Sequence, residues 1–310
     1  MELLIYLILF LLVLIVSSTT NKLLPFLPLP LVQILLGIVI GLFLPNTDFH
    51  LNTELFLALV IGPLLFRESE EADITAILKH WRIIVYLIFP VIFISTLSLG
   101  GLAHLLWLSL PLAACLAVGA ALGPTDLVAF ASLSERFSFP KRVSNILKGE
   151  GLLNDASGLV AFQVALTAWT TGAFSLGQAS SSLIFSILGG FLIGFLTAMT
   201  NRFLHSFLLS VRATDIASEL LLELSLPLVT FFLAEEVHVS GIIAVVVAGI
   251  LKASRFKKIT LLEAQVDTVT ETVWHTVNFM LNGSVFVILG MELEMIAEPI
   301  LTNPIYNPLL

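Results

Sequence analysis

Long apolar stretches dominate the sequence of this 310-residue chain, and they leave few folds open to it. Hydrophobic residues make up 58% of the chain and charged residues only 12%, about half the charged share of a soluble domain. A soluble core cannot absorb so large an apolar fraction. Stretches of about 20 apolar residues, the length of a membrane-crossing helix, recur ten times. The sequence therefore predicts an all-α polytopic membrane protein with helices near residues 3–20, 23–44, 52–66, 83–107, 110–134, 145–171, 180–201, 216–236, 239–251 and 273–296.

The positions of the basic residues test this segmentation. When the ten segments cross the membrane in turn, all 14 Lys and Arg residues fall in or beside alternate loops, on one side. Cytoplasmic loops carry an excess of Lys and Arg, and a wrong segment count would scatter the pattern. The run from Leu3 to Val16 lacks a basic leader, so it is interpreted as a retained first helix. We expect a plasma-membrane protein with cytoplasmic basic loops and with both termini of this chain outside.

Composition and motifs exclude several functional classes. A net charge of −8 makes a nucleic-acid partner unfavourable, because phosphate binding needs a basic face. The single cysteine, Cys115, cannot form an intramolecular disulfide. The sequence contains no phosphate-binding Gly-rich motif, no metal-ligand Cys/His spacing and no Ser-His-Asp order. We therefore predict neither an enzyme nor a cofactor, and the lack of linkers predicts a single transmembrane domain over residues 1–310.

The fifth apolar segment contains an interruption. Pro124 has no N–H, so the carbonyl of Ala120 loses its helical donor, and Gly123 tolerates the resulting backbone. The expected outcome is one broken helix with freed carbonyls beside Thr125 and Asp126. Irregular backbone at membrane depth is buried or lines a cavity, where it often coordinates a cation. The alternative is a simple proline kink, with Asp126 reaching the cytoplasmic edge.

The sixth segment carries a second acidic site. Asp155 follows Lys148 by seven residues, which places it ~10 Å into the helix, and Asp126 is ~12 Å from the same face. Glu150 and Gly151 lie one turn before Asn154 and Asp155. Since the two segments are neighbours joined by a short loop, the two aspartates are predicted at similar depth. Their hard oxygens suit protons and small cations.

Two carboxylates close together in a low-dielectric site cannot both ionise at low cost. A proton or a cation must neutralise them, and competition between the two for one carboxylate is the minimum requirement for antiport. The alternative is a structural hydrogen-bonded network inside the helix bundle.

Other polar and small residues receive structural interpretations. Asp215, Glu219 and Glu223 lie on one face near a cytoplasmic helix start, where acids suit the helix dipole, and they are interpreted as solvated or interfacial. A contact with a cavity or another subunit is the alternative. The small-residue pairs are expected to allow close helix packing; they are Gly37 with Gly41 and Gly190 with Gly194.

These motifs resemble those of monovalent cation/proton antiporters of the NhaP/NHE type. The resemblance covers nearly the whole chain, from Leu35-Leu36-Gly37 and Glu54-Leu55-Phe56 through Gly123-Pro124-Thr125-Asp126, Glu150-Gly151-Leu152-Leu153-Asn154-Asp155 and Ser240-Gly241-Ile242-Ile243-Ala244-Val245-Val246-Val247-Ala248-Gly249 to Phe286-Val287-Ile288-Leu289-Gly290-Met291-Glu292-Leu293.

The resemblance implies residue roles. Asp155 would carry the cation and the proton in alternation, and Asp126 with the Thr125 backbone carbonyl would complete the ion site. Asn154 stands where the electroneutral exchangers carry Asn, which implies one-for-one exchange of Na⁺, Li⁺ or K⁺ for H⁺. The family also implies a homodimer in the lipid bilayer and an elevator-like motion of a core bundle. Glu150, Gly151, Gly123 and Pro124 would support the site.

Two departures from the family pattern accompany the resemblance. Gly151 stands where the family usually has Ser, so one hydroxyl ligand is absent. Family members have about thirteen membrane helices, and ten are predicted here, so the chain is expected to be C-terminally truncated. The leading hypothesis is a sodium/proton antiporter with a role in Na⁺ and pH homeostasis. The alternative is a non-transporting remnant or a helical partner subunit, and a carrier of small organic anions is weaker because the membrane segments contain acids and no Arg.

Overall fold

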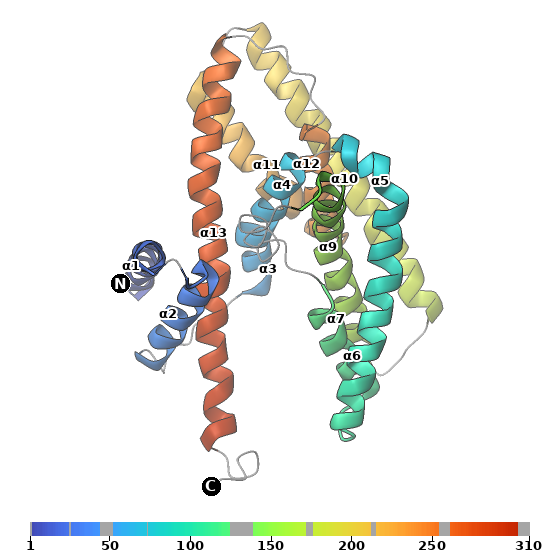
Figure 1. Ribbon diagram of the computed structural model, residues 1–310. Helices are drawn as coiled ribbons and strands as arrows, with labels where there is room; N and C mark the ends of the chain where they lie inside the picture. The colour runs from blue at the N-terminus through green and yellow to red at the C-terminus, as the bar shows by residue number, and fades with distance from the viewer. Residues whose placement is uncertain are drawn as a thin grey trace. The chain divides into compact units, whose positions relative to one another are not determined.

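A computed structural model describes residues 2–24, 26–43, 52–72, 74–124, 139–171, 176–211, 215–253 and 261–302. Within these ranges every regular element is helical and no strand occurs, which confirms the all-α prediction (Figure 1). The helices are α1 (Glu2–Leu23), α2 (Leu29–Phe43), α3 (Thr53–Phe56), α4 (Gly62–Glu71), α5 (Ile74–Tyr86), α6 (Ile92–Leu106), α7 (Leu112–Leu122), α9 (Lys141–Thr171), α10 (Leu176–Ser210), α11 (Ile216–Glu236), α12 (Gly241–Ala253) and α13 (Leu261–Thr302). Two π-helical turns, η1 (Leu57–Ile61) and η2 (Leu87–Val91), join α3 to α4 and α5 to α6.

Each of the ten predicted segments overlaps a described helix, and α11 has the predicted bounds. Three helical stretches of the described chain are long and apolar enough to cross a membrane, namely Phe185–Ser210, Ile216–Glu236 and Thr268–Leu293. Shorter apolar helices accompany them at Ile8–Leu23, Leu29–Leu42, Ile92–Leu106, Leu112–Leu122 and Gly241–Ala253. Large apolar side chains are exposed along these helices, as at Phe185, Phe203 and Phe232. So many exposed apolar side chains suit contact with lipid tails.

Local sequence explains where several helices begin. Asp215 is the N-cap of α11, and its Oδ1 accepts a hydrogen bond from the Ser218 N–H at 2.9 Å. The hydroxyl of Ser218 also donates to Asp215, and these bonds lower the pKa of the Asp215 carboxyl. Asn52 caps α3 by accepting from the N–H groups of Glu54 and Leu55. Both caps satisfy donors that a helix start leaves without partners.

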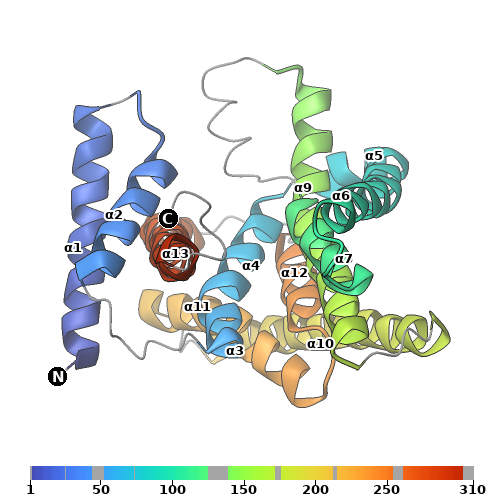
Figure 2. The same cartoon turned by 90° about the horizontal axis from the view of Figure 1, so that it is seen from below.

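The chain divides into two compact units, residues 1–64 with 261–310 and residues 65–260. In the first unit, α13 packs against α2, and α1 packs against α2 (Figure 2). The crossing of α2 and α13 is close: a Cβ on Gly37 would lie 2.2 Å from the Val287 carbonyl oxygen, and one on Gly290 would lie 2.2 Å from that of Ile34. The close packing expected at Gly37 is thereby confirmed.

In the second unit, α6 packs against α7, α7 against α9, and α10 against both α11 and α12. Gly190 and Gly194 allow α10 to meet α12, since a Cβ on Gly194 would lie 2.2 Å from the Ala244 carbonyl oxygen. This confirms the packing predicted for that pair. The hydroxyl of Thr230 on α11 donates to the hydroxyl of Thr197 on α10 at 3.0 Å, and both residues are buried. The α7–α9 contact positions the polar residues considered next.

Candidate functional site

The helix α7 ends where the sequence predicts an interruption. Its last residue is Leu122, Gly123 is the C-cap, and Pro124 follows. Pro124 cannot donate a backbone hydrogen bond, so the helical ladder stops at this point. Thr125 and Asp126 lie outside the described residues, and the choice between a broken helix and a kink with Asp126 at the cytoplasmic edge therefore stays a prediction.

The helix α9 carries a buried polar stripe. Glu150, Asn154 and Gly158 are spaced four residues apart and share one face. All three are buried, and Asn154 is only 1% exposed. Gly151, one turn before Asp155, is buried too. Asp155 belongs to the same turn of α9 as Asn154, but its side chain lies outside the described part of the chain.

The interrupted end of α7 lies against this stripe. A Cβ on Gly158 would lie 2.2 Å from Cγ of Pro124, so the proline ring fits against α9 only because residue 158 has no side chain. Gly158 follows Asn154 by one turn, or ~6 Å along the helix. The structure thus brings Pro124 next to Gly158, one turn beyond Asn154, and α7 packs against α9 as expected of neighbouring segments. The similar depth of Asp126 and Asp155 stays a prediction.

We expect Gly158→Ala to disturb this contact. Replacing a helical glycine with alanine normally stabilises a helix by about 1 kcal/mol. Here overpacking against Pro124 should outweigh that gain, since such insertions cost about 1–3 kcal/mol. Thermal unfolding in detergent should show a lower midpoint for Gly158→Ala. The matched control is Gly101→Ala, because a Cβ on Gly101 meets nothing within 4 Å. A midpoint for Gly158→Ala equal to that of the control would contradict the packing.

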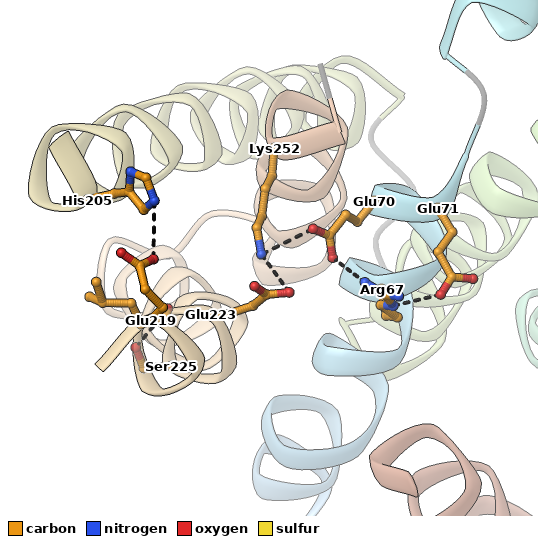
Figure 3. Close-up of polar contacts among 9 residues, drawn as sticks. Arg67, Glu70, Glu71, His205, Glu219, Glu223, Ser225 and Lys252 are labelled. Atoms are coloured by element: carbon orange, nitrogen blue, oxygen red, sulfur yellow. Dashed lines mark hydrogen bonds and ion pairs between the residues drawn. The ribbon is translucent and has the colours of Figure 1, made fainter. Parts of the chain in front are cut away.

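A second polar cluster joins the ends of several helices in the same unit (Figure 3). Lys252 near the end of α12 contacts two carboxylates, with Nζ 3.1 Å from Glu70 Oε1 and 2.8 Å from Glu223 Oε1. Arg67 of α4 pairs with Glu70 at 2.9 Å and with Glu71 at 2.7 Å. The Lys252 side chain is 10% exposed and its partners Glu70 and Glu223 are 15% and 14% exposed, so the two Lys252 pairs are largely removed from solvent. Glu71, in contrast, is 58% exposed. The cluster ties α4, α11 and α12 together.

The acidic face of α11 differs from its predicted environment. The interpretation of Glu219 and Glu223 as solvated or interfacial is wrong, because their side chains are only 11% and 14% exposed. Glu219 Oε2 lies 3.3 Å from Nε2 of His205 on α10, and Glu223 pairs with Lys252. Asp215, in contrast, is the exposed N-cap. Both glutamates instead pair with side chains of neighbouring helices in this chain, and the alternative of a contact with a cavity or another subunit stays a prediction.

A sequence signal for this cluster existed. The basic-residue pattern places the ends of α4, α10 and α12 and the start of α11 on one side of the membrane, and the ion pairs join these ends. Arg67, Glu70 and Glu71 also have the spacing of helical ion pairs. The pairing between helices depends on tertiary packing and could not be predicted residue by residue.

Among the side chains that the structure describes, no group of three His, Cys, Asp or Glu is arranged to hold a metal ion. Asp126 and Asp155, the two side chains predicted to bind a cation, are outside that set. The described residues provide a buried amide at Asn154 and a buried carboxyl group at Glu150, four and eight residues before the glycine that contacts Pro124. Such oxygen-rich surroundings suit a proton or a hard cation rather than a thiophilic metal.

The long apolar helices and their many exposed apolar side chains indicate a membrane-embedded helical protein. A family model described as "Sodium/hydrogen exchanger, transmembrane" matches residues 7–307. The chain belongs to the sodium/hydrogen exchanger family, which confirms the resemblance to NhaP/NHE-type antiporters.

Individual relatives agree with this assignment. The "Sodium, potassium, lithium and rubidium/H(+) antiporter" of Bacillus subtilis is 37% identical over 288 residues, which are 93% of this chain and 43% of the relative. An uncharacterized Na(+)/H(+) exchanger of Escherichia coli, YjcE, is 32% identical over 306 residues, 96% of this chain and 54% of the relative. The chain thus spans about half the length of these curated relatives.

The fold also matches a solved structure. The sodium proton antiporter MjNhaP1 from Methanocaldococcus jannaschii aligns with a TM-score of 0.72, covering 98% of this chain and 73% of that chain. The sequence identity of this alignment is 20%, so the match concerns the fold.

Proposed function

We propose that this chain is the transmembrane part of an antiporter that exchanges Na⁺, or Li⁺ or K⁺, for H⁺. The observation that carries the proposal is the contact of Pro124, at the interrupted end of α7, with Gly158 on the buried face of α9 that also carries Glu150 and Asn154. Membership of the exchanger family and the names of the relatives support it. They do not favour the alternative of a non-transporting remnant or partner subunit.

The chemistry follows from burial of carboxyl groups in a low-dielectric site. A carboxylate there is costly to ionise unless a cation lies beside it, so its neutral state holds either a proton or a cation. In the proposal, Asp155 is the group that alternates between them. Asp126 and the Thr125 carbonyl complete the cation site, and Asn154 adds a neutral oxygen. The transported cation and proton are cargo, and no resident cofactor takes part.

The neutral amide of Asn154 sets the expected stoichiometry. With one alternating carboxylate, the site binds either one monovalent cation or one proton at a time. The loaded site therefore carries the same net charge in both directions of transport. Exchange should then be electroneutral. In proteoliposomes, cation uptake driven by a pH gradient should be unchanged when valinomycin and K⁺ impose a membrane potential. A potential that accelerates or slows uptake would contradict one-for-one exchange.

The basic loops are placed in the cytoplasm in this proposal, with the homodimer in the plasma membrane. Ion pairs join the ends of α4, α10 and α12 to the start of α11. This proximity supports the proposed alternation of membrane crossings, on which that orientation depends. A role in Na⁺ and pH homeostasis follows from the exchange itself.

Everted membrane vesicles provide the test. A respiration-driven pH gradient is monitored with a fluorescent amine, and NaCl, LiCl or KCl is then added. Cation addition should reverse the fluorescence quenching in vesicles that contain the chain. It should not do so in vesicles without the chain. Equal responses of the two vesicle types, with the chain present in the membrane, would contradict the proposed activity.

A further inference from the structure

The end of α10 and the start of α11 are joined by a contact whose charge depends on pH. His205 lies five residues before the last residue of α10, and Glu219 lies in the first turn of α11. Nε2 of His205 is 3.3 Å from Oε2 of Glu219, and the two side chains are 18% and 11% exposed (Figure 3). Histidine is the side chain whose ordinary pKa, about 6.5, falls in the physiological range. The contact is therefore an ion pair only when His205 holds a proton.

The other charged groups around this contact keep their charge near neutral pH. On the described parts of α10 and of the helices that join it in the cluster, they are Arg202 of α10, Asp215 and Glu223 of α11, Lys252 of α12, and Arg67, Glu70 and Glu71 of α4. Glu223 pairs with Lys252, whereas Arg202 and Asp215 are exposed. Carboxyl groups, lysine and arginine titrate far from neutral pH at their ordinary pKa values. In this cluster His205 is thus the group that responds to pH in that range.

A second contact between the same two helices does not titrate. The Thr230 hydroxyl of α11 donates to the Thr197 hydroxyl of α10 at 3.0 Å, and both residues are buried. Thr197 precedes His205 by eight residues and Thr230 follows Glu219 by eleven, so the two contacts are ~12 Å apart along α10 and ~16 Å apart along α11. A proton on His205 therefore acts on one end of the α10–α11 contact, while the threonine pair holds the helices further along.

We propose that His205 and Glu219 form a proton-binding site, separate from the cation site, that strengthens the contact between α10 and α11 when a proton is bound. The Glu219 carboxylate supplies the counter-charge, and the partial exposure of His205 gives protons access. As the pH rises through the titration of the imidazole, the ionic attraction is lost and this end of α10 is held less firmly. The inference goes beyond the proposed function and does not rest on it, because neither residue belongs to the cation site.

The test is a double-variant cycle measured at two pH values. The midpoint of thermal unfolding in detergent is compared for the wild-type chain, His205→Gln, Glu219→Gln and the double variant. The measurements are made at about pH 5.5 and about pH 8.5, on either side of the ordinary imidazole pKa. At the lower pH the double variant should lose less than the sum of the single losses, by a few degrees, because the two side chains are coupled. At the higher pH this coupling should nearly vanish, because a neutral imidazole forms no ion pair.

Two controls share the same measurement. Thr197→Val and Thr230→Val form the matched cycle, because they remove a polar contact between the same helices that does not titrate. The coupling in that cycle should be equal at both pH values. His275→Gln removes an exposed histidine on α13 and should leave the pH dependence of the midpoint unchanged.

A third variant, His205→Lys, keeps the inference testable if an uncharged substitution does not fold. It places a permanent positive charge beside Glu219, so its midpoint should change less between the two pH values than that of the wild-type chain. Equal coupling of His205 and Glu219 at both pH values, or no coupling at the lower pH, overturns the inference. So does a His205→Lys variant whose midpoint follows the pH as the wild-type midpoint does. None of these outcomes bears on cation exchange, so the inference and the proposed function can fail separately.

Discussion

Asp155→Asn is expected to abolish the cation-induced dissipation of the pH gradient in everted vesicles. An amide of the same shape neither takes up a proton nor offers a negative charge to a cation, so both halves of the exchange are lost. The substitution is nearly isosteric and lies in a long helix, so the amount of protein in the membrane should be unchanged. The assay is the fluorescence response to NaCl over a range of concentrations.

Asp215→Asn is the matched control for this variant. Asp215 is an exposed aspartate at the start of α11, and asparagine is an equally good N-cap. The control should exchange at the wild-type rate. An Asp155→Asn variant that exchanges normally would show that the proton and cation carrier has been assigned to the wrong residue.

Lys252→Met is expected to be the most destabilising change outside the cation site. The Lys252 ammonium contacts both Glu70 and Glu223, and its side chain is largely buried. Nζ also lies 5.5 Å from the centre of the Phe66 ring. Removing one partner from a buried ion pair leaves uncompensated charge and costs about 3–5 kcal/mol. The midpoint of thermal unfolding in detergent should therefore fall clearly.

The control and the coupling test use the same measurement. Lys79 lies on α5 of the same unit and is exposed, so Lys79→Met should leave the midpoint nearly unchanged. Adding Glu223→Gln to Lys252→Met removes a carboxylate that has lost its pair with Lys252, so the double variant should lose less stability than the sum of the single variants. Strict additivity, or equal midpoints for the two lysine variants, would contradict the role of Lys252.

Hydropathy predicted the helical segments well where the helix ends coincide with the ends of the apolar runs. The bounds of α11 agree because Asp215 caps its start. Other helices extend past the predicted segments. The helix α13 begins at Leu261 instead of near residue 273, and the run through α4 continues to Glu71 instead of 66. These extensions are polar, and an apolarity criterion cannot detect a helix that continues into polar surroundings.

The sequence predicted only part of the candidate site, because some of its features are local and others depend on tertiary packing. The effect of Pro124 on α7 is local, since a missing N–H ends the helical ladder whatever surrounds it. The burial of Glu150 and Asn154 followed from their place in an apolar segment. The contact of Pro124 with Gly158, and the pairing of Lys252 with Glu223, depend on how separate helices pack. Neither contact has a signature in the spacing of residues along one helix.

The central claim is that the Asp155 carboxyl group on α9 exchanges a monovalent cation for a proton. The most direct measurement is ²²Na⁺ uptake into proteoliposomes that contain the purified chain, with an acidic interior and a more alkaline medium. We predict rapid uptake that requires the pH gradient and disappears in Asp155→Asn. Uptake that is equal with and without the gradient, or equal in Asp155→Asn and the wild-type chain, would contradict the account.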